Sequence, residues 1–235
     1  VIPPSEINFR ANIYAMKKIG VERIISVSAV GGMKESMPPG HFVVPHQFID
    51  RTYKRISTFF TEGMGGHVSM ADPVCTTTSE VITKSAKSIT LNVHTSGTYL
   101  VMEGPQFSSR AESNWYRSIG CDVIGMTNMP EAKLAREAEM AYATVAMVTD
   151  YDCWHQDHDD VNTASILKVL QNNSEHAKEL IKALVPRLGA LQAPFESGAH
   201  TSLEHAIATV PEQRDPELSA KLAVITKRVI DNPGW

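Results

Sequence analysis

Hydrophobic positions at the start of the chain follow a helical period and then form a continuous run. The helical positions are Ile7, Ala11, Tyr14 and Ile19. They predict a helix from about Ser5 to Gly20, a residue able to take the left-handed capping conformation. The apolar run at 24–30 predicts a strand that ends at Gly31-Gly32, where missing side chains let backbone amides approach a ligand or another strand. This order is typical of a parallel α/β sheet, whose ligands gather at the carboxyl ends of strands.

Further strands and helices alternate along the rest of the chain. Strands are predicted at 42–44, 98–102 and 121–126, and a polar, glycine-rich loop at 61–66. Residues 142–148 are almost uninterruptedly apolar, as expected of a central strand covered on both faces. Ser109 and Glu112 have the spacing of a capping box, so a helix should begin there and run to Gly120. Other helices are predicted at 79–87, 130–139, 163–184 and 216–229, with Pro130 in a first turn.

These elements predict an α/β fold with a mixed, largely parallel central sheet flanked by helices. The 235 residues, 43% of them hydrophobic, suffice for one substantial core, so a single domain is expected. We place its main part at 1–190 and a C-terminal helical extension at 191–235.

Composition narrows the possible partners. The net charge of −4 comes from 22 basic and 26 acidic residues that are scattered along the chain, without the basic block that nucleic-acid binding needs. No apolar run approaches the roughly 20 residues that cross a bilayer. The three cysteines are widely spaced and odd in number, which suits reduced thiols that pack in a cytoplasmic protein. We expect a small-molecule substrate, with no nucleic acid and no membrane.

Polar residues stand at the ends of three predicted strands, at Ser28, at Met126-Thr127 and at 149–152. The carboxyl ends of parallel strands share one edge of a sheet, so these groups can converge on one cleft. Hydroxyls and main-chain amides there would bind an anion, and the carboxylates Asp150 and Asp152 would accept hydrogen bonds from the ring and amino protons of a nitrogenous base. Each feature by itself is more often a plain loop start or a helix cap.

Four motifs together resemble one enzyme family. They are NFRANI at 8–13, QFIDRT at 47–52, EGPQFSSRAES at 103–113 and TDYDCW at 149–154. In this order they resemble the 5'-methylthioadenosine phosphorylases, a trimeric branch of the purine nucleoside phosphorylases, over about residues 5–190. The resemblance implies the nucleoside phosphorylase fold, a homotrimer or dimer of trimers, no cofactor and no metal, and inorganic phosphate as co-substrate.

Two positions discriminate within the family that the motifs resemble. Relatives that act on 6-oxopurines carry Glu and Asn where this chain has Ser108 and Asp150. Adenine offers an exocyclic amino donor where 6-oxopurines offer a carbonyl acceptor, so a carboxylate favours adenine. The resemblance therefore implies cleavage of 5'-methylthioadenosine to adenine and 5-methylthioribose 1-phosphate.

The resemblance also implies residue roles. Asp150 would donate a proton to N7 of the departing purine while Asp152 receives the 6-amino group, because close carboxylates resist ionising together. Ser28 and Thr127 would bind phosphate. The substrate would contact Ala29, Phe107, Ser108, the backbone of Met126, Thr149, and, around the 5' substituent, Thr163, Ile166, Leu167 and His67 of a neighbouring subunit.

The family pattern begins with a strand and a glycine-rich phosphate turn, followed by an Arg-His pair that also holds phosphate. The present sequence starts after both, so residues 1–190 lack these parts of the pattern. Because an arginine supplies a strong charge-assisted contact to phosphate, we expect this segment by itself to bind phosphate poorly.

Three other functions remain open at this point. The run at 153–160 is rich in possible metal ligands, which allows a metallohydrolase. A noncatalytic nucleoside-binding homologue is the second alternative. The third is a phosphorylase of adenosine or of 6-oxopurine nucleosides.

Overall fold

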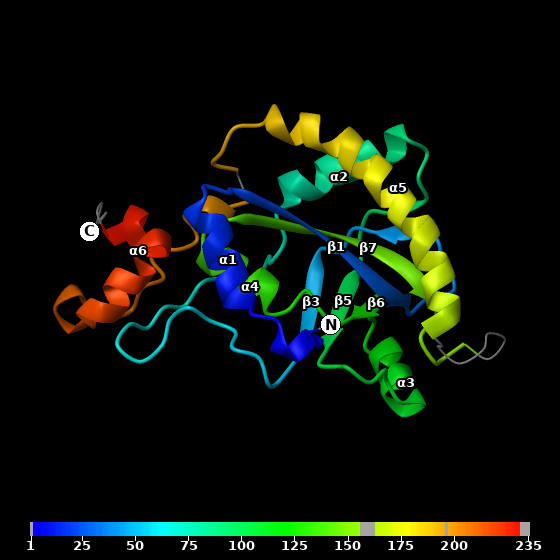
Figure 1. Ribbon diagram of the computed structural model, residues 1–235, viewed down its shortest axis with the longest axis horizontal. Coiled ribbons are helices and arrows are strands. Elements are labelled where there is room, and N and C mark those ends of the chain that lie inside the picture. The colour runs from blue at the N-terminus through cyan, green and yellow to red at the C-terminus, as the bar shows by residue number, and fades with distance from the viewer. Residues whose placement is uncertain (1, 156–162, 196, 231–235) are drawn as a thin grey trace.

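The computed structural model describes residues 2–155, 163–195 and 197–230, and within them seven strands form one sheet (Figure 1). The strand order across the sheet is β3-β5-β6-β1-β7-β2-β4. Their bounds are β1 (Arg23–Gly32), β2 (Phe42–Val43), β3 (Gln47–Arg51), β4 (Val93–His94), β5 (Thr98–Met102), β6 (Val123–Gly125) and β7 (Ala141–Asp150).

Most neighbouring strands of this sheet are parallel. β1 pairs in parallel with β7, and the pairs β3-β5, β5-β6 and β2-β4 are also parallel. The pairs β1-β6 and β2-β7 are antiparallel. The predicted mixed, largely parallel sheet is therefore confirmed.

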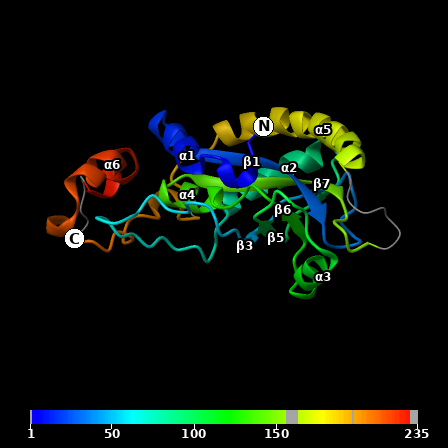
Figure 2. The same ribbon diagram turned by 60° about the horizontal axis from the view of Figure 1, so that its bottom comes forward.

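Helices cover both faces of the sheet (Figures 1 and 2). On one face lie α2 (Thr76–Ser88) and α5 (Thr163–Gly189), and on the other lie α1 (Phe9–Lys18) and α4 (Glu131–Glu137), with α6 (Pro216–Ile230) outside α1. The helix α3 (Arg110–Ser118) packs at the end of β5 and β6. Short 3-10 turns occupy Pro4–Glu6, Ala199–Thr201 and Pro211–Gln213.

The strand β7 lies at the centre of the core. Every residue from Ala141 to Thr149 is buried, which confirms a strand covered on both faces. Because side chains alternate along a strand, Ala143, Val145 and Met147 pack towards α2 and α5 while Tyr142 and Val148 join the core on the opposite side.

Several element boundaries differ from the prediction. The first helix begins at Phe9 and not near Ser5, and the Asn8 side chain caps it. Pro130 is the N-cap of α4 and lies outside its first turn. The long helix continues through Pro186 to Gly189 because its apolar face, with Leu184 and Leu188, keeps packing on the sheet.

Other boundaries bear directly on the strand ends. Ser28 lies inside β1, which continues to Gly32, and Thr149 and Asp150 belong to β7. Tertiary pairing explains both, since β1 and β7 pair from Arg23 as far as Gly31. The short strands β3 and β4 were not predicted. By contrast, β5 matches its predicted bounds, and Ser109 with Glu112 forms the expected capping box of α3.

The C-terminal residues pack on the same core as the rest of the chain. Leu222 and Ile225 of α6 are buried with Phe9 and Ile13 of α1. No helix in the described ranges is long and apolar enough to span a membrane. The boundary placed near residue 190 stays a prediction.

A buried carboxylate, that of Glu139 after α4, connects α6 to the rest of the core. Glu139 accepts hydrogen bonds from Arg228 Nη2 and Nε at 2.6 and 2.7 Å and from the Leu203 amide at 3.0 Å. The Glu139 side chain is only 2% exposed. Arg228 is therefore the main group that compensates this buried charge.

We predict that Arg228→Met lowers the free energy of unfolding by about 1–2 kcal/mol, because Glu139 loses its charged partner while Arg228 itself is partly solvent-screened. Urea denaturation measures the loss. The matched control on α6 is Lys221→Met, which removes an exposed ion pair with Glu217. This variant should have the same urea midpoint of unfolding as the parent. Equal effects of the two variants would contradict the proposed anchoring.

Candidate active site

Strand ends from the middle of the sheet surround a cavity of about 430 Å³. This volume suits a small-molecule ligand. The lining residues belong to β1, β5, β6 and β7, to the segments that follow these strands, or to the turn Pro4–Glu6. They are Pro4, Val27, Ser28, Ala29, Val30, Gly31, Met102, Phe107, Ile124, Gly125, Met126, Thr127, Thr149, Asp150 and Asp152.

The antiparallel pairing of β1 with β6 brings two hydroxyls together. Gly31 pairs with Ile124 in this register. Beyond this short ladder, Ser28 in β1 and Thr127, which follows β6, lie close together, and their hydroxyl oxygens are 3.5 Å apart. The predicted convergence is confirmed. Its predicted cause, a shared edge of parallel strands, is wrong for this pair.

Two carboxyl groups line the same cavity, those of Asp150 and Asp152. Asp150 Oδ2 accepts a hydrogen bond from Thr149 Oγ1 at 2.7 Å, and Asp150 Oδ1 accepts one from the Asp152 amide at 2.8 Å. A side-chain carbon at Gly31 would lie 3.0 Å from Asp150 Oδ1. Glycine at this position therefore leaves room for the carboxylate.

Burial makes both carboxyl groups hold protons more tightly than a free aspartate. Burial raises the pKa of Asp150. It raises the pKa of Asp152 to about 6; the nearby Ser113 hydroxyl opposes this shift, and the negative charge of Asp150 adds to it. Asp152 is 7% exposed, and its Oδ2 is buried with no hydrogen-bond partner among the described residues. The pair thus offers a transferable proton and an unsatisfied acceptor to a ligand.

Most of the residues implied by the family resemblance line this cavity. Eight do so, namely Ser28, Ala29, Phe107, Met126, Thr127, Thr149, Asp150 and Asp152. Ser108 lies outside the lining, and its carbonyl accepts a hydrogen bond from Cys153 Sγ. Leu167 is 57% exposed on α5, and His67 is exposed in the loop beside Ala206. The side chains of Thr163 and Ile166 lie outside the described residues, so the 5' assignments stay predictions.

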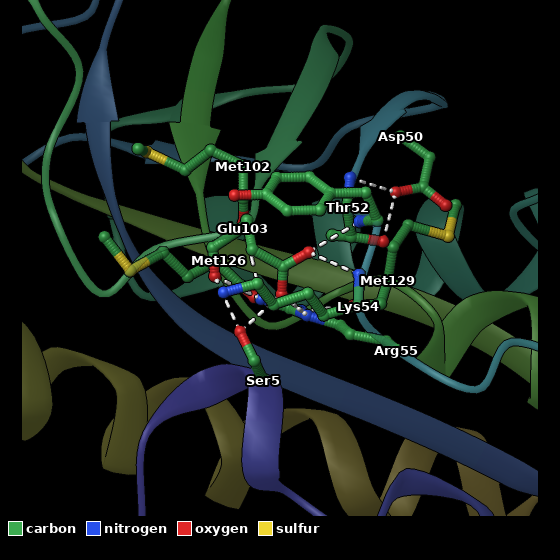
Figure 3. Close-up of polar contacts among 10 residues, drawn as sticks. Ser5, Asp50, Thr52, Lys54, Arg55, Met102, Glu103, Met126 and Met129 are labelled. Atoms are coloured by element: carbon green, nitrogen blue, oxygen red, sulfur yellow. Dashed lines mark hydrogen bonds and ion pairs between the residues drawn. The ribbon is translucent and has the colours of Figure 1, made fainter.

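A buried arginine behind the cavity wall was missed by sequence reasoning (Figure 3). Arg55 Nε donates to Glu103 Oε1 at 3.0 Å, and the two side chains are 1% and 5% exposed. Its terminal nitrogens donate to the carbonyl oxygens of Met126, Met129 and Glu103 at 2.6, 2.5 and 2.6 Å, and of Met102 at 3.4 Å. The only sequence signal was its position just after the motif at 47–52.

Glu103 gathers further donors around this pair. Its carboxylate accepts hydrogen bonds from the Ser5 hydroxyl, from the Tyr53 amide at 2.5 Å and from the Lys54 amide at 3.0 Å (Figure 3). Burial by itself would raise the pKa of Glu103, yet these bonds and Arg55 lower it to about 2. The carboxylate is therefore charged throughout the physiological range.

The ion pair between Arg55 and Glu103 sets the position of the cavity wall. Met102, Met126 and the turn next to Ser5 all contribute to the wall or adjoin it. Arg55 does not line the cavity, so the Met126 carbonyl is bonded to a group outside it. The Met126 carbonyl oxygen, which would repel an anion, is therefore bonded to Arg55 and does not point into the cavity.

Metal ligation was one of the open alternatives. Within the part of the chain that the structure describes, no group of three His, Cys, Asp or Glu side chains is placed to hold a metal ion. Residues 156–160 of the ligand-rich run lie outside that part.

Two hydroxyls and two buried carboxyl groups line one cavity at the middle of a mixed sheet, and this set of groups suits an anion together with a nitrogenous base. Residues 1–186 match the family model described as the phosphorylase superfamily. The chain belongs to this superfamily, in its S-methyl-5'-thioadenosine phosphorylase branch.

Sequence relatives support the branch. The chain is 51% identical over 230 residues to the S-methyl-5'-thioadenosine phosphorylase of Rhodospirillum rubrum, and the match covers 98% of this chain and 78% of the relative. It is 50% identical over 227 residues to the enzyme of that name from Cereibacter sphaeroides, covering 97% of this chain and 78% of the relative.

Solved structures show the same fold. A methylthioadenosine phosphorylase from an antarctic soil metagenomic library superposes with a TM-score of 0.89 at 46% identity, covering 95% of this chain and 78% of that one. The methylthioadenosine phosphorylase of Schistosoma mansoni in complex with adenine gives 0.82 at 32% identity, covering 92% and 80%. The predicted nucleoside phosphorylase fold is confirmed.

We predict that Arg55→Met lowers the free energy of unfolding by about 3–5 kcal/mol, because it leaves the buried Glu103 carboxylate uncompensated. The double variant Arg55→Met, Glu103→Gln should recover part of this loss. As a matched control, Lys133→Met breaks the more exposed pair with Asp50 and should cost about 1 kcal/mol or less. Urea denaturation measures all three, and a loss in the single variant no larger than in the control would contradict the prediction.

We predict that Asp152→Asn changes how stability depends on pH. The folded pKa of about 6 exceeds the unfolded value, so the parent protein loses stability relative to the variant as pH rises from about 4 to about 6. Above that window the pH-dependent part of this difference should stay constant at about 3 kcal/mol. Thermal melts of both proteins across pH 4–8 measure it, and a difference independent of pH would refute the shifted pKa.

Proposed function

We propose that this protein cleaves the glycosidic bond of 5'-methylthioadenosine with inorganic phosphate and releases adenine and 5-methylthioribose 1-phosphate. The observation that carries the proposal is the cavity in which Ser28 and Thr127 face the buried pair Asp150 and Asp152. The names of the relatives agree with it.

The bond changes follow from this placement. A phosphate oxygen, held by the Ser28 and Thr127 hydroxyls and the Ala29 amide, attacks C1' of the ribose. The bond from C1' to N9 breaks, its electron pair passes to the purine, and Asp150 gives its proton to N7. General acid catalysis of this kind contributes about 10²–10⁴-fold to the rate.

The two carboxyl groups divide their roles when a purine binds. Asp152 has the unsatisfied oxygen, so it accepts the hydrogen bond from the 6-amino group. Accepting a hydrogen bond favours the carboxylate form of Asp152. Because two adjacent carboxylates resist ionising together, the shared proton then moves to Asp150, where N7 requires it.

Other contacts complete the proposal. Phe107 lies against the purine or ribose, the backbone of Met126 faces the sugar hydroxyls, and Ser108 and Thr149 support the base. Thr163, Ile166 and Leu167 surround the methylthio group, and His67 enters the site of a neighbouring copy in a homotrimer or dimer of trimers. The enzyme acts in the cytoplasm, with phosphate as co-substrate and without a cofactor.

Adenosine is the second candidate substrate. One similar structure, from Schistosoma mansoni, is named an adenosine/methylthioadenosine phosphorylase. The described cavity residues would contact the adenine base, which both nucleosides share, and the phosphate, which is the co-substrate in both reactions.

We predict that adenine is released from 5'-methylthioadenosine only when phosphate is present, because phosphate is the attacking group. Chromatography of the products with 5'-methylthioadenosine, adenosine and inosine measures the preference. Asp150→Asn should lower the rate on the adenine nucleosides by about 10²-fold or more and move the preference towards inosine. Binding without phosphate-dependent release would indicate a noncatalytic homologue, and unchanged preference in the variant would refute base selection by Asp150.

A further inference from the structure

A tyrosine hydroxyl lies directly behind the proposed phosphate-binding serine. Tyr99 belongs to β5, is 0% exposed and does not line the cavity. Its Oη is 2.9 Å from Ser28 Oγ. The ring is fixed by its neighbour Phe48, with the two ring centroids 5.7 Å apart. The hydroxyl is therefore held in one place against Ser28.

Gly125 allows the tyrosine to reach the serine. β6 lies between β5 and β1 in the sheet. A side-chain carbon at Gly125 would lie 1.9 Å from Tyr99 Oη, so any other residue would displace the hydroxyl. Gly125 itself lines the cavity. Because Gly125 has no side chain, the Tyr99 hydroxyl can pass this short strand and contact the Ser28 hydroxyl.

The polarity of this contact follows from elementary chemistry. Burial raises the pKa of Tyr99, so the phenol keeps its proton. A phenol hydroxyl is a better donor than an alkyl hydroxyl, so Tyr99 donates and the Ser28 oxygen accepts. Ser28 must then direct its own hydrogen elsewhere.

The remaining acceptors decide where that hydrogen goes. Ser28 Oγ is 3.4 Å from the Ala29 carbonyl and 3.5 Å from Thr127 Oγ1, both at the long limit of a hydrogen bond. An anionic oxygen in the cavity would be a stronger acceptor than either of them. Because the Ser28 oxygen already accepts a hydrogen bond from Tyr99, its own hydroxyl hydrogen is available to an acceptor in the cavity.

We propose that Tyr99 is a positioning residue that fixes the Ser28 hydroxyl as a hydrogen-bond donor to inorganic phosphate. This inference rests on the proposed function, which assigns phosphate to Ser28. Tyr99 touches neither substrate and acts only through the serine.

The test is the phosphate KM of Tyr99→Phe, which removes one hydroxyl and keeps the ring. We expect this KM to rise about 5-fold, the effect of one lost hydrogen bond, while the nucleoside KM changes less than about 2-fold. In a Ser28→Ala background the same substitution should have no further effect, because the hydroxyl that it orients is gone.

Tyr142→Phe is the matched control. Tyr142 is also fully buried, and its hydroxyl donates to Glu131 Oε1 at 2.8 Å, outside the cavity lining. Both tyrosine variants lose one buried hydrogen bond, and thermal melts verify that both are folded. The phosphate KM of Tyr142→Phe should equal that of the parent.

The outcomes separate this inference from the proposed function. If Ser28→Ala leaves the phosphate KM unchanged, the phosphate role of Ser28 is wrong and the inference falls with it. If Ser28→Ala raises this KM but Tyr99→Phe does not, only the role of Tyr99 is overturned. A rise in both KM values, a rise of the phosphate KM in the control, or additive effects in the double variant would also overturn it, because each indicates a general structural effect.

Discussion

The geometry of the cavity depends on the buried pair of Arg55 and Glu103. One guanidinium satisfies four backbone carbonyls and one carboxylate, and that carboxylate satisfies two amides and a serine hydroxyl. In a low-dielectric interior every one of these groups would be costly to leave unpaired. The segments around residues 5, 54, 103 and 126 therefore have one mutually consistent arrangement, and this arrangement places the cavity wall.

The second constraint is the pairing of β1 with its two neighbouring strands, β7 and β6. β1 runs parallel to β7 along most of its length and meets β6 antiparallel only at its last residues. The pairing with β6 brings the hydroxyls of Ser28 and Thr127 close to each other, and the pairing with β7 sets Gly31 beside Asp150. Backbone pairing thus brings two hydroxyls and two buried carboxyl groups to one cavity.

Sequence patterns were reliable where local chemistry decides the structure. The capping box of Ser109 and Glu112, the strand β5 and the buried strand β7 all follow from short-range periodicity and composition. The two-residue strand β4 and the mostly polar strand β3 were missed because their pairing partners, β2 and β5, are distant in the sequence. The ends of the predicted strands already indicated six of the eight cavity residues, and the family resemblance added Ala29 and Phe107.

The sequence by itself determined all the α-helices and most of the strands, that the central strand is buried on both faces, and which polar residues lie at the ends of the apolar runs. Only the tertiary structure decided that Asp152 has an unsatisfied buried oxygen, that Tyr99 reaches Ser28 past Gly125, and that Arg55 holds the wall. The physical reason is that hydrogen bonding and desolvation depend on which groups meet in space. Residues 55 and 103, or 28 and 99, are far apart along the chain, so no local pattern records their contact.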